Sequence, residues 1–405
     1  MEVKAGYKQT DVGVIPEDWA VVPFADIANI RKQKVNPQLE DDIFCIDLEH
    51  IARDSGRLLG YSDVPSDSTV KASFKKNDVL FGRLRAYLRK FWLAERDGVC
   101  STEIWPIVAK PSVTTGQYLF QLIQTERFLD AAVIAYGTHM PRSDWNVVKK
   151  VLVVIPPPPE QRAIATAISD VDALITSLDK LIAKKRDIKQ AAMQELLTGK
   201  RRLPGFSGEW TTTTLGELGN FFKGNGIKKD EVLSEGLPCI RYGEIYTCYD
   251  DYFRNFFSFI SDDTAKGSQQ IKKGDLLFAG SGETAEDIGK CVAYMGDDIA
   301  YAGGDVIILT PKTGDSMYLS YLINSPSVAN EKAKMGQGEM IVHISGRNLA
   351  KLVVTLPSVT EQTAIATVLS DMDAELTALE QMRDKTKALK QGMMQELLTG
   401  RIRLV

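Results

Sequence analysis

The sequence has few of the residues that usually build metal centres and catalytic sites. Its 405 residues include five cysteines and three histidines. No two cysteines have the C-x-x-C spacing of a shared metal site, and an odd, scattered set is typical of reduced thiols. We therefore expect neither a bound metal nor a disulfide framework. The cysteines are Cys45, Cys100, Cys239, Cys248 and Cys291.

Long hydrophobic runs are also missing. No stretch approaches the roughly 18 apolar residues that a membrane span needs. The first residues, Met1-Glu2-Val3-Lys4, lack the apolar core of a secretory signal. These absences predict a cytoplasmic protein that has no membrane partner.

A strong excess of charge of either sign is absent as well. The chain has 49 Lys and Arg against 53 Asp and Glu, a formal net charge of −4. This balance excludes a uniformly basic nucleic-acid-binding protein, but not a DNA reader whose basic groups are local. Residues 1–155 contain 20 basic and 20 acidic groups, whereas residues 204–356 contain 14 and 20. The second segment, at −6, is therefore a poor candidate for holding phosphates alone, and weak, salt-sensitive DNA binding by the isolated chain is expected.

What the sequence does contain is an internal repeat. Residues 160–203 and 361–404 are identical at 24 of 44 aligned positions, at a constant offset of 201. A weaker echo precedes each copy, since Trp19 parallels Trp210. The sequence therefore predicts a variable domain, a long helix, a second variable domain and a second long helix. We place these four parts at residues 1–155, 156–203, 204–356 and 357–405.

Both repeat copies predict a helix of about 40 residues, roughly 60 Å long at 1.5 Å per residue. The first follows the prolines at 156–159 and ends at Gly199, and the second ends at Gly400. Apolar residues recur in steps of three and four, the pattern of a coiled-coil seam. Two similar stripes in one chain favour an intramolecular antiparallel pair, with a homodimeric coiled coil as the alternative. The seam residues, which also mark the predicted partner-binding spacer helices, are Ile164, Ile168, Val171, Ile175, Leu178, Ile365, Leu369, Met372, Leu376 and Leu379.

The segments before the two helices predict α+β domains of about 150 residues. They contain short β-branched and aromatic runs separated by Gly, Asp and Asn, such as 78–81 and 305–309. Helices are expected at 116–135 and 316–335. With antiparallel long helices, the two domains would be related by a pseudo-two-fold. That symmetry suits a ligand with its own dyad, such as duplex DNA.

The helix motifs resemble those of type I restriction–modification specificity subunits. The resemblance rests on the proline-rich turn into 160–165, the Ser-Asp-Val-Asp step at 169–172, and the junction 195–210 with its partial repeat at 396–404. It implies a noncatalytic subunit whose two target-recognition domains each read half of a bipartite DNA site. The helices would act as a spacer and dock two methyltransferase subunits. S-adenosylmethionine would bind those subunits, so no cofactor is expected on this chain, and a restriction subunit would join the assembly.

Residues 81–90 are the strongest local signal for DNA contact. Arginine offers bidentate contacts to guanine edges and phosphates, and an interleaved tyrosine can pack against a base or sugar. The alternative is a solvated hairpin whose arginines pair with acidic side chains. The glycine-led loop 137–142 adds a His and an Arg, although a structural turn accounts for it equally well. The first-domain candidates are Arg83, Arg85, Tyr87, Arg89, Lys90, His139 and Arg142.

The second domain departs from this pattern. Its corresponding stretch, 277–283, lacks the arginines, so contacts cannot be transferred to it by analogy. The second-domain candidates are Arg241, Tyr242, Ser281, Lys290, Gln337 and His343.

Two other classes of function remain as alternatives. Residues 278–282 fit the F-x-G-x-G turn of many adenosylmethionine enzymes, but the chain contains no Asn/Asp-Pro-Pro-aromatic tetrapeptide. A standalone adenine methyltransferase is therefore not expected. The other alternative is a coiled-coil scaffold that organises protein partners without touching DNA.

Overall fold

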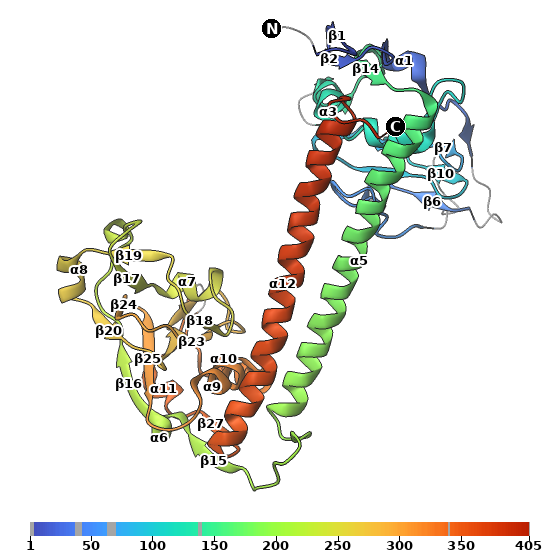
Figure 1. Cartoon of the computed structure of the whole chain (residues 1–405). Coiled ribbons are helices and arrows are strands. Elements are labelled where there is room, and N and C mark those ends of the chain that lie inside the picture. Colours follow the sequence, from blue (N-terminus) through green and yellow to red (C-terminus); the bar gives the residue numbers. More distant parts are fainter. Residues whose placement is uncertain (1–3, 37–42, 63–69, 137–139, 339–340, 405) are drawn as a thin grey trace. The chain divides into compact units, whose positions relative to one another are not determined.

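The computed structural model describes residues 4–36, 43–62, 70–136, 140–338 and 341–404. The chain divides into two compact units, which we describe separately (Figure 1). Unit 1 comprises Met1–Lys180 and Gln381–Val405, and unit 2 comprises Leu181–Glu380. Each unit therefore contains one globular segment and part of both long helices.

Unit 1 is built on two four-stranded sheets. Its central strand β8 reads as an apolar run because it is buried throughout. The first sheet has the order β4 (Ala28–Ile30), β11 (Ile104–Ala109), β8 (Val79–Gly82), β9 (Phe91–Leu93), and the second has the order β5 (Lys34–Val35), β7 (Lys71–Phe74), β10 (Gly98–Cys100), β6 (Cys45–Ile46). Smaller pairs are β1 (Tyr7–Thr10) with β2 (Gly13–Pro16), β3 (Ala20–Pro23) with β14 (Leu152–Ile155), and β12 (Ala135–Tyr136) with β13 (Arg142–Ser143).

Unit 2 repeats this plan with a five-stranded and a four-stranded sheet. The first has the order β16 (Gly219–Lys223), β25 (Val306–Pro311), β21 (Leu276–Ala279), β23 (Cys291–Tyr294), β18 (Tyr252–Phe253). The second has the order β19 (Ser258–Ile260), β17 (Leu237–Ile240), β24 (Ala300–Ala302), β20 (Gln269–Ile271). The pairs are β15 (Thr211–Thr214) with β27 (Val353–Leu356), and β22 (Ser281–Gly282) with β26 (Val342–His343).

Short helices cover these sheets. Unit 1 has α1 (Phe24–Ile27), η1 (Leu48–His50), η2 (Ala86–Leu88), α2 (Gly116–Leu122), α3 (Glu126–Val133) and α4 (Trp145–Val148). Unit 2 has α6 (Leu215–Leu218), η3 (Lys229–Glu231), α7 (Tyr242–Thr247), α8 (Asp262–Lys266), α9 (Ser316–Asn324), α10 (Pro326–Met335) and α11 (Gly346–Leu349).

The helices predicted at 116–135 and 316–335 are each broken into two. In unit 2 the break falls at Ser325, and Pro326 then occupies the first turn of α10, where its missing N–H has no cost. In unit 1, Thr125 adopts an extended conformation before α3 and its hydroxyl donates to the Leu122 carbonyl. Local hydrogen bonding by these polar side chains overrides the helical periodicity.

The two long helices form as predicted. They are α5 (Pro158–Leu196) and α12 (Val359–Leu397), each 39 residues long. Shortly after each helix, Gly199 and Gly400 adopt left-handed φ values of +70° and +73°. Glycine suits this position because a side chain there would be strained.

The packing of the long helices is antiparallel within each unit. In unit 1, Ile164 and Ile168 near the start of α5 share a core with Leu397 at the end of α12. In unit 2, Ile365 near the start of α12 shares a core with Leu196 at the end of α5. The predicted α+β class and the intramolecular antiparallel pairing are thus confirmed, whereas the pseudo-two-fold stays a prediction.

The seam residues are buried to different degrees. Ile164, Ile168, Ile175, Leu178, Ile365 and Leu369 are buried, and Val171, Met372, Leu376 and Leu379 are half-buried. The ends of each stripe pack into the cores of the globular segments. At roughly 2 kcal/mol for each fully buried aliphatic side chain, these contacts make both helices part of both units.

Candidate nucleic-acid interface

One edge of each unit has the same backbone frame but different side chains. In unit 1, Arg83 follows strand β8; its N–H donates to the Glu103 carbonyl at 2.9 Å and its carbonyl accepts from the Ser143 N–H at 2.9 Å. In unit 2, Gly280 follows β21 and makes the same two bonds, with Asp305 at 2.7 Å and Ile344 at 2.9 Å. Arg83 and Gly280 therefore occupy equivalent positions.

The equivalence continues along this edge. Leu84 bridges to Arg142 in unit 1, as Ser281 pairs with His343 in unit 2. We call this feature the variable edge: residues 83–84, 103 and 142 of unit 1, and residues 280–281, 305 and 343 of unit 2. A fixed backbone that carries different side chains is how binding loops on a common scaffold acquire different ligands.

Three of the unit 1 candidates have side chains available for contact at or near this edge. The Arg83 guanidinium lies 5.5 Å from the Trp105 ring, and its buried Nε has no hydrogen-bond partner among the residues that the structure describes. Arg85 is exposed in the left-handed conformation, with φ +54°, and its N–H donates to the Pro141 carbonyl. Tyr87 is 56% exposed.

Arg89 and Lys90 have partners within unit 1. Arg89 lies 3.0 Å from an Asp54 carboxylate oxygen and 3.2 Å from one of Glu126. Lys90 donates from Nζ to the Leu48 carbonyl, and burial lowers its pKa. Arg89 and Lys90 therefore both bind groups of unit 1. Such pairing within the chain is what the alternative interpretation, a solvated hairpin, predicts for these basic side chains.

Arg142 makes a bidentate ion pair with Glu103, at distances of 2.7–3.1 Å. The hydrogen bond from Arg142 lowers the pKa of the Glu103 carboxyl, and the same bond raises the pKa of Arg142. Arg142 therefore lies at the variable edge with its charge compensated. His139 lies outside the described residues.

Unit 2 contains two adjoining cavities, of about 990 and 400 Å³, that share Lys223 and Asp305. The larger contains the candidates Arg241 and Tyr242, and the smaller contains His343. We call the two together the unit 2 groove. Further polar residues that the sequence did not single out also line it, among them Lys223, Asn225, Lys229 and Arg347.

The groove positions its candidates by local hydrogen bonds. The Arg241 N–H caps helix α7 by donating to Glu244 Oε2 at 2.8 Å, and Tyr242 is partly exposed beside it. The buried Ser281 hydroxyl lies 2.9 Å from His343 Nδ1, which holds the exposed imidazole at the groove. Gln337 pairs with His343 through the backbone.

Lys290 is the second-domain candidate that lies apart from these. Its Nζ donates to the Tyr249 carbonyl, so it holds a backbone segment in the way that Lys90 does in unit 1. The structure thus brings five second-domain candidates to the groove and variable edge. Lys290 is not among the residues that line the groove.

Glycine-rich loops form part of the groove. A Cβ at Gly224 would lie 2.0 Å from the Gly303 carbonyl oxygen, so only glycine permits this close approach. Asp305, at φ +60°, lies 3.9 Å from Lys223 Nζ. The Lys-Gly-Asn-Gly run at 223–226 was the signal in the sequence that could have located this loop.

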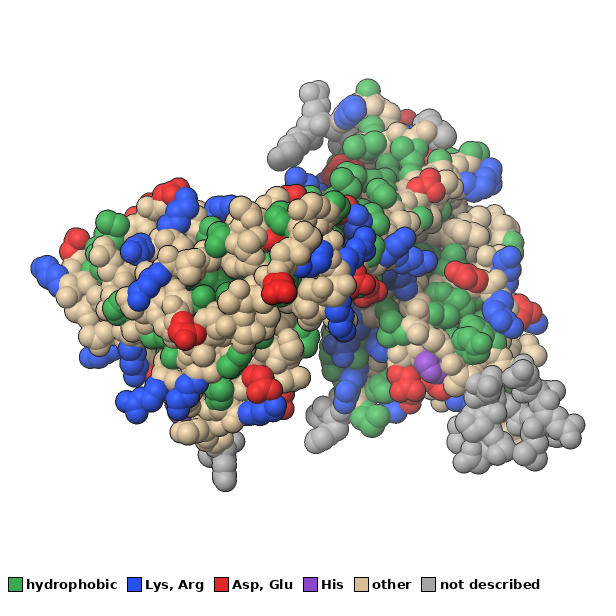
Figure 2. Space-filling view, turned by 90° about the horizontal axis from the view of Figure 1, so that it is seen from below, with side chains coloured by type: hydrophobic (Ala, Val, Ile, Leu, Met, Phe, Trp, Pro, Cys, Tyr) green, Lys and Arg blue, Asp and Glu red, His purple; other side chains and the backbone are tan. Residues whose placement is uncertain are grey.

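The charge of the groove differs from that of its unit. Basic and acidic side chains are interspersed over the face shown in Figure 2. The groove lining contains four basic residues, Lys223, Lys229, Arg241 and Arg347, against two acidic ones, Glu244 and Asp305. The acidity of the second segment therefore does not extend to this groove, which suits a negatively charged ligand.

Two kinds of feature are not found in the part of the chain that the structure describes. It holds no group of three or more His, Cys, Asp or Glu that could bind a metal ion. None of its helices is long and apolar enough to cross a membrane.

Comparison with known proteins gives a consistent result. The sequence matches the family described as the type I restriction modification DNA specificity domain, over residues 16–187 and 207–391. The MjaVIII specificity subunit of Methanocaldococcus jannaschii is 24% identical over 96% of this chain and 94% of its own. The EcoDI specificity subunit of Escherichia coli is 24% identical over 48% of this chain and 45% of its own.

Solved structures share the fold. A type I restriction–modification S subunit from M. genitalium has a TM-score of 0.62 at 15% identity, over 98% of each chain. A chain from a study of complex assembly and conformational transition of the type I R-M system has a TM-score of 0.59 at 18% identity, over 96% of this chain and 99% of its own.

Proposed function

Because the chain belongs to the type I restriction modification DNA specificity family, we propose that units 1 and 2 each read one half of a bipartite DNA site. The chain is the DNA-recognition subunit of a type I restriction–modification system, a noncatalytic role, and its relatives are named as specificity subunits. The variable edge is the observation that supports one half-site for each unit. Its backbone hydrogen bonds are the same in both units while its side chains differ, so the two units can read two different half-sites.

In unit 1 the free side chains suit base and sugar contacts. Arg85, the N-cap residue of η2, and Tyr87 within η2 are both exposed, and the Arg83 guanidinium lies 5.5 Å from the Trp105 ring. An arginine can read guanine in the major groove through two hydrogen bonds, and a tyrosine can stack. We assign these three residues to the first half-site.

In unit 2 the groove supplies both kinds of contact. Lys223, Lys229 and Arg347 would hold phosphates, which fixes the register of the duplex without reading its sequence. Arg241 and His343, whose positions are fixed by hydrogen bonds within the unit, would face base edges. We assign these residues to the second half-site.

The long helices would dock two methyltransferase subunits and set the distance between the half-sites. Their seam residues are mostly occupied within the chain, so a partner would contact other faces. Exposed apolar residues recur at intervals of seven on those faces, which is the spacing of a helix stripe. They are Leu174, Leu181 and Ile188 on α5, and Met382 and Leu389 on α12.

S-adenosylmethionine would bind the methyltransferase subunits and not this chain, and a restriction subunit would join the assembly. Partner subunits would also supply much of the phosphate contact, since residues 1–155 have no net charge and residues 204–356 have a net charge of −6. This division predicts strong DNA binding by the assembly and weak binding by the chain alone.

The test is single-molecule sequencing of methylated adenines in cells that carry the chain and its methyltransferase partner. We expect a bipartite motif with an unread gap. The double substitution R85A/Y87A should alter or abolish recognition of one half only, and the exposed R201A variant serves as the matched control. Loss of sequence preference in both halves at once would contradict the assignment of one half to each unit.

A further inference from the structure

In unit 1, a lysine of one long helix contacts the other helix and the globular segment at the same time. Lys390 of α12 has its Nζ 2.8 Å from Asp172 Oδ1 on α5. The same ammonium donates to Gln124 Oε1, between α2 and α3, at 3.1 Å. The Lys390 side chain is largely buried, so these two acceptors replace the water that it loses on folding.

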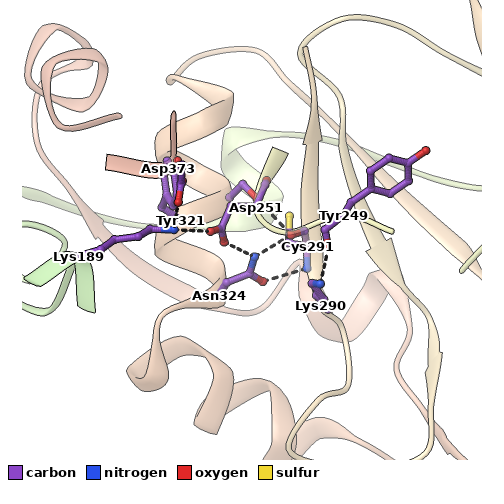
Figure 3. Close-up of polar contacts among 9 residues, drawn as sticks. Lys189, Tyr249, Asp251, Lys290, Cys291, Tyr321, Asn324 and Asp373 are labelled. Atoms are coloured by element: carbon purple, nitrogen blue, oxygen red, sulfur yellow. Dashed lines mark hydrogen bonds and ion pairs between the residues drawn. The ribbon is translucent and has the colours of Figure 1, made fainter. Parts of the chain in front are cut away.

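Unit 2 contains the same three-way contact (Figure 3). Lys189 of α5 has its Nζ 2.5 Å from Asp373 Oδ1 on α12 and 3.5 Å from Asp251 Oδ2, in the loop before β18. The Tyr321 hydroxyl donates to Asp373 Oδ2 at 2.5 Å, and Asn324 Nδ2 donates to Asp251 Oδ1 at 2.9 Å. Lys189 therefore joins both helices to the loop before β18, and residues of α9 bind the two carboxylates that it contacts.

We call these contacts the unit 1 junction (Lys390, Asp172 and Gln124) and the unit 2 junction (Lys189, Asp373 and Asp251). The two lysines are separated by the repeat offset of 201, and so are Asp172 and Asp373. Only the third member differs, since it is a neutral amide in unit 1 and a carboxylate in unit 2. Burial raises the pKa of the Asp251 carboxyl, so its charged form depends on the neighbouring ammonium.

The junctions can select a register that the apolar seam cannot select by itself. Apolar residues spaced three and four apart pack almost equally well after the helices slip by one turn. Such a slip moves a side chain by about 5.4 Å along the axis, which is beyond hydrogen-bonding reach. It would leave a lysine and an aspartate buried without partners, and a buried charge without its partner is strongly unfavourable.

We propose that Lys189 and Lys390 are positioning residues that seat each unit's globular segment on the helix pair in a single register. The inference rests on the proposed function, because the register fixes where each variable edge stands along the helices. Each lysine acts through its junction and touches no DNA.

The difference between the junctions gives a specific test by charge exchange. In unit 1, K390D/D172K keeps one cation and one anion, and Gln124 can turn its amide to donate where it previously accepted. This turn gives up the bond from Gln124 Nε2 to the Phe120 carbonyl, but Gln121, whose Nε2 has no partner among the described residues, can turn with it and donate to Gln124. In unit 2, K189D/D373K would place a second carboxylate beside Asp251, which can only accept. Replacing that carboxylate by an amide, in K189D/D373K/D251N, would make the unit 2 junction resemble that of unit 1.

The first measurement is thermal unfolding of the purified full chain. Each single reversal, K390D, D172K, K189D or D373K, should lower the midpoint by roughly 5–15 °C. The exchange K390D/D172K should recover most of this loss, K189D/D373K should not, and adding D251N should restore it. The matched control is K185E and E375K, two single reversals at a more exposed pair between the same two helices, with side chains 32% and 48% exposed, which are expected to shift the midpoint little.

The second measurement is the methylated motif of the assembled complex, read with the charge-neutral variants K390M and K189M. We expect unchanged half-sites with reduced methylation and more than one gap length, and a single gap length again in K390D/D172K. Unchanged gap and unfolding midpoint in K390M and K189M would overturn the inference, as would failure of K390D/D172K to recover. If the unaltered complex methylates no bipartite motif, the proposed function fails, while the unfolding series still tests the junctions.

Discussion

Removing Arg403 is expected to destabilise unit 1 far more than its position two residues from the end of the sequence suggests. Arg403 makes two hydrogen bonds to Glu160, at 2.8 and 2.7 Å, and two to Asp18, at 2.8 and 2.9 Å. Glu160 is completely buried, and its other hydrogen bond comes from Trp19 Nε1 at 2.9 Å. These bonds connect the segment after α12 to the start of α5 and to the segment around Trp19.

The expected loss follows from the burial of Glu160. Breaking a buried ion pair by removing one partner costs about 3–5 kcal/mol, because the other charge is left uncompensated. The Arg403 side chain is 30% exposed, so water can replace part of its contact and the lower end, about 3 kcal/mol, applies. For a unit of this size that is a fall of about 6–12 °C in midpoint.

Thermal unfolding of R403A at pH 7 measures this loss. R401A is the matched control, because Arg401 is exposed and pairs with the half-buried Glu396 at 3.1 Å, which predicts a change of about 0.5 kcal/mol or less. The double variant R403A/E160Q should recover stability, since it removes the buried charge. The reasoning is refuted if R403A unfolds like R401A, or if R403A/E160Q is no more stable than R403A.

Three further predictions concern the core, the groove and the helices. Lys332 is 2% exposed, burial lowers its pKa to about 8, and its Nζ donates to the Gly289 carbonyl. Because the folded pKa lies below the ordinary value of 10.5, the folded chain is most stable above pH 10.5, where Lys332 is neutral. It loses stability as the pH falls from 10.5 to about 8 and the buried lysine becomes charged. K332M should therefore be more stable than the unaltered chain by about 3 kcal/mol at pH 7, and the difference should vanish above about pH 11 in urea unfolding. In the assembly, each of K223A, K229A and R347A should reduce the salt dependence of DNA binding by about one unit in log–log slope and leave the first half-site unchanged; an unchanged slope would place the phosphates elsewhere. Insertion of four residues in the middle of α5 should lengthen the unread gap, since it adds about 6 Å, and a methylome with altered half-sites would contradict this.

The arginines near the variable edge show what the sequence could not predict, namely which of them pair with acidic side chains. Arg85, Arg89 and Arg142 look alike in the sequence, as members of basic loops. In the structure Arg85 is exposed, whereas Arg89 and Arg142 pair with acidic residues far away in the sequence. Residue type gives the sign of a charge, but the fold decides which partner compensates it.

The sequence by itself determined the repeat, the two long helices and their pairing. These follow from local causes, namely apolar residues three and four apart, prolines at the start of the first helix, and glycines after both. Each of these acts within a few residues, so it can be read without the fold.

Only the tertiary structure decided which side chains meet at the variable edge, that Lys223 and Arg347 line one groove, and that Lys189 and Lys390 sit in equivalent junctions. Glu160 and Arg403 are likewise separated by 243 residues in the sequence. The physical reason is that ion pairs and grooves depend on distances between remote segments, which packing sets and local sequence does not. The weak acidity of the whole chain therefore gave no measure of the basic groove that unit 2 contains.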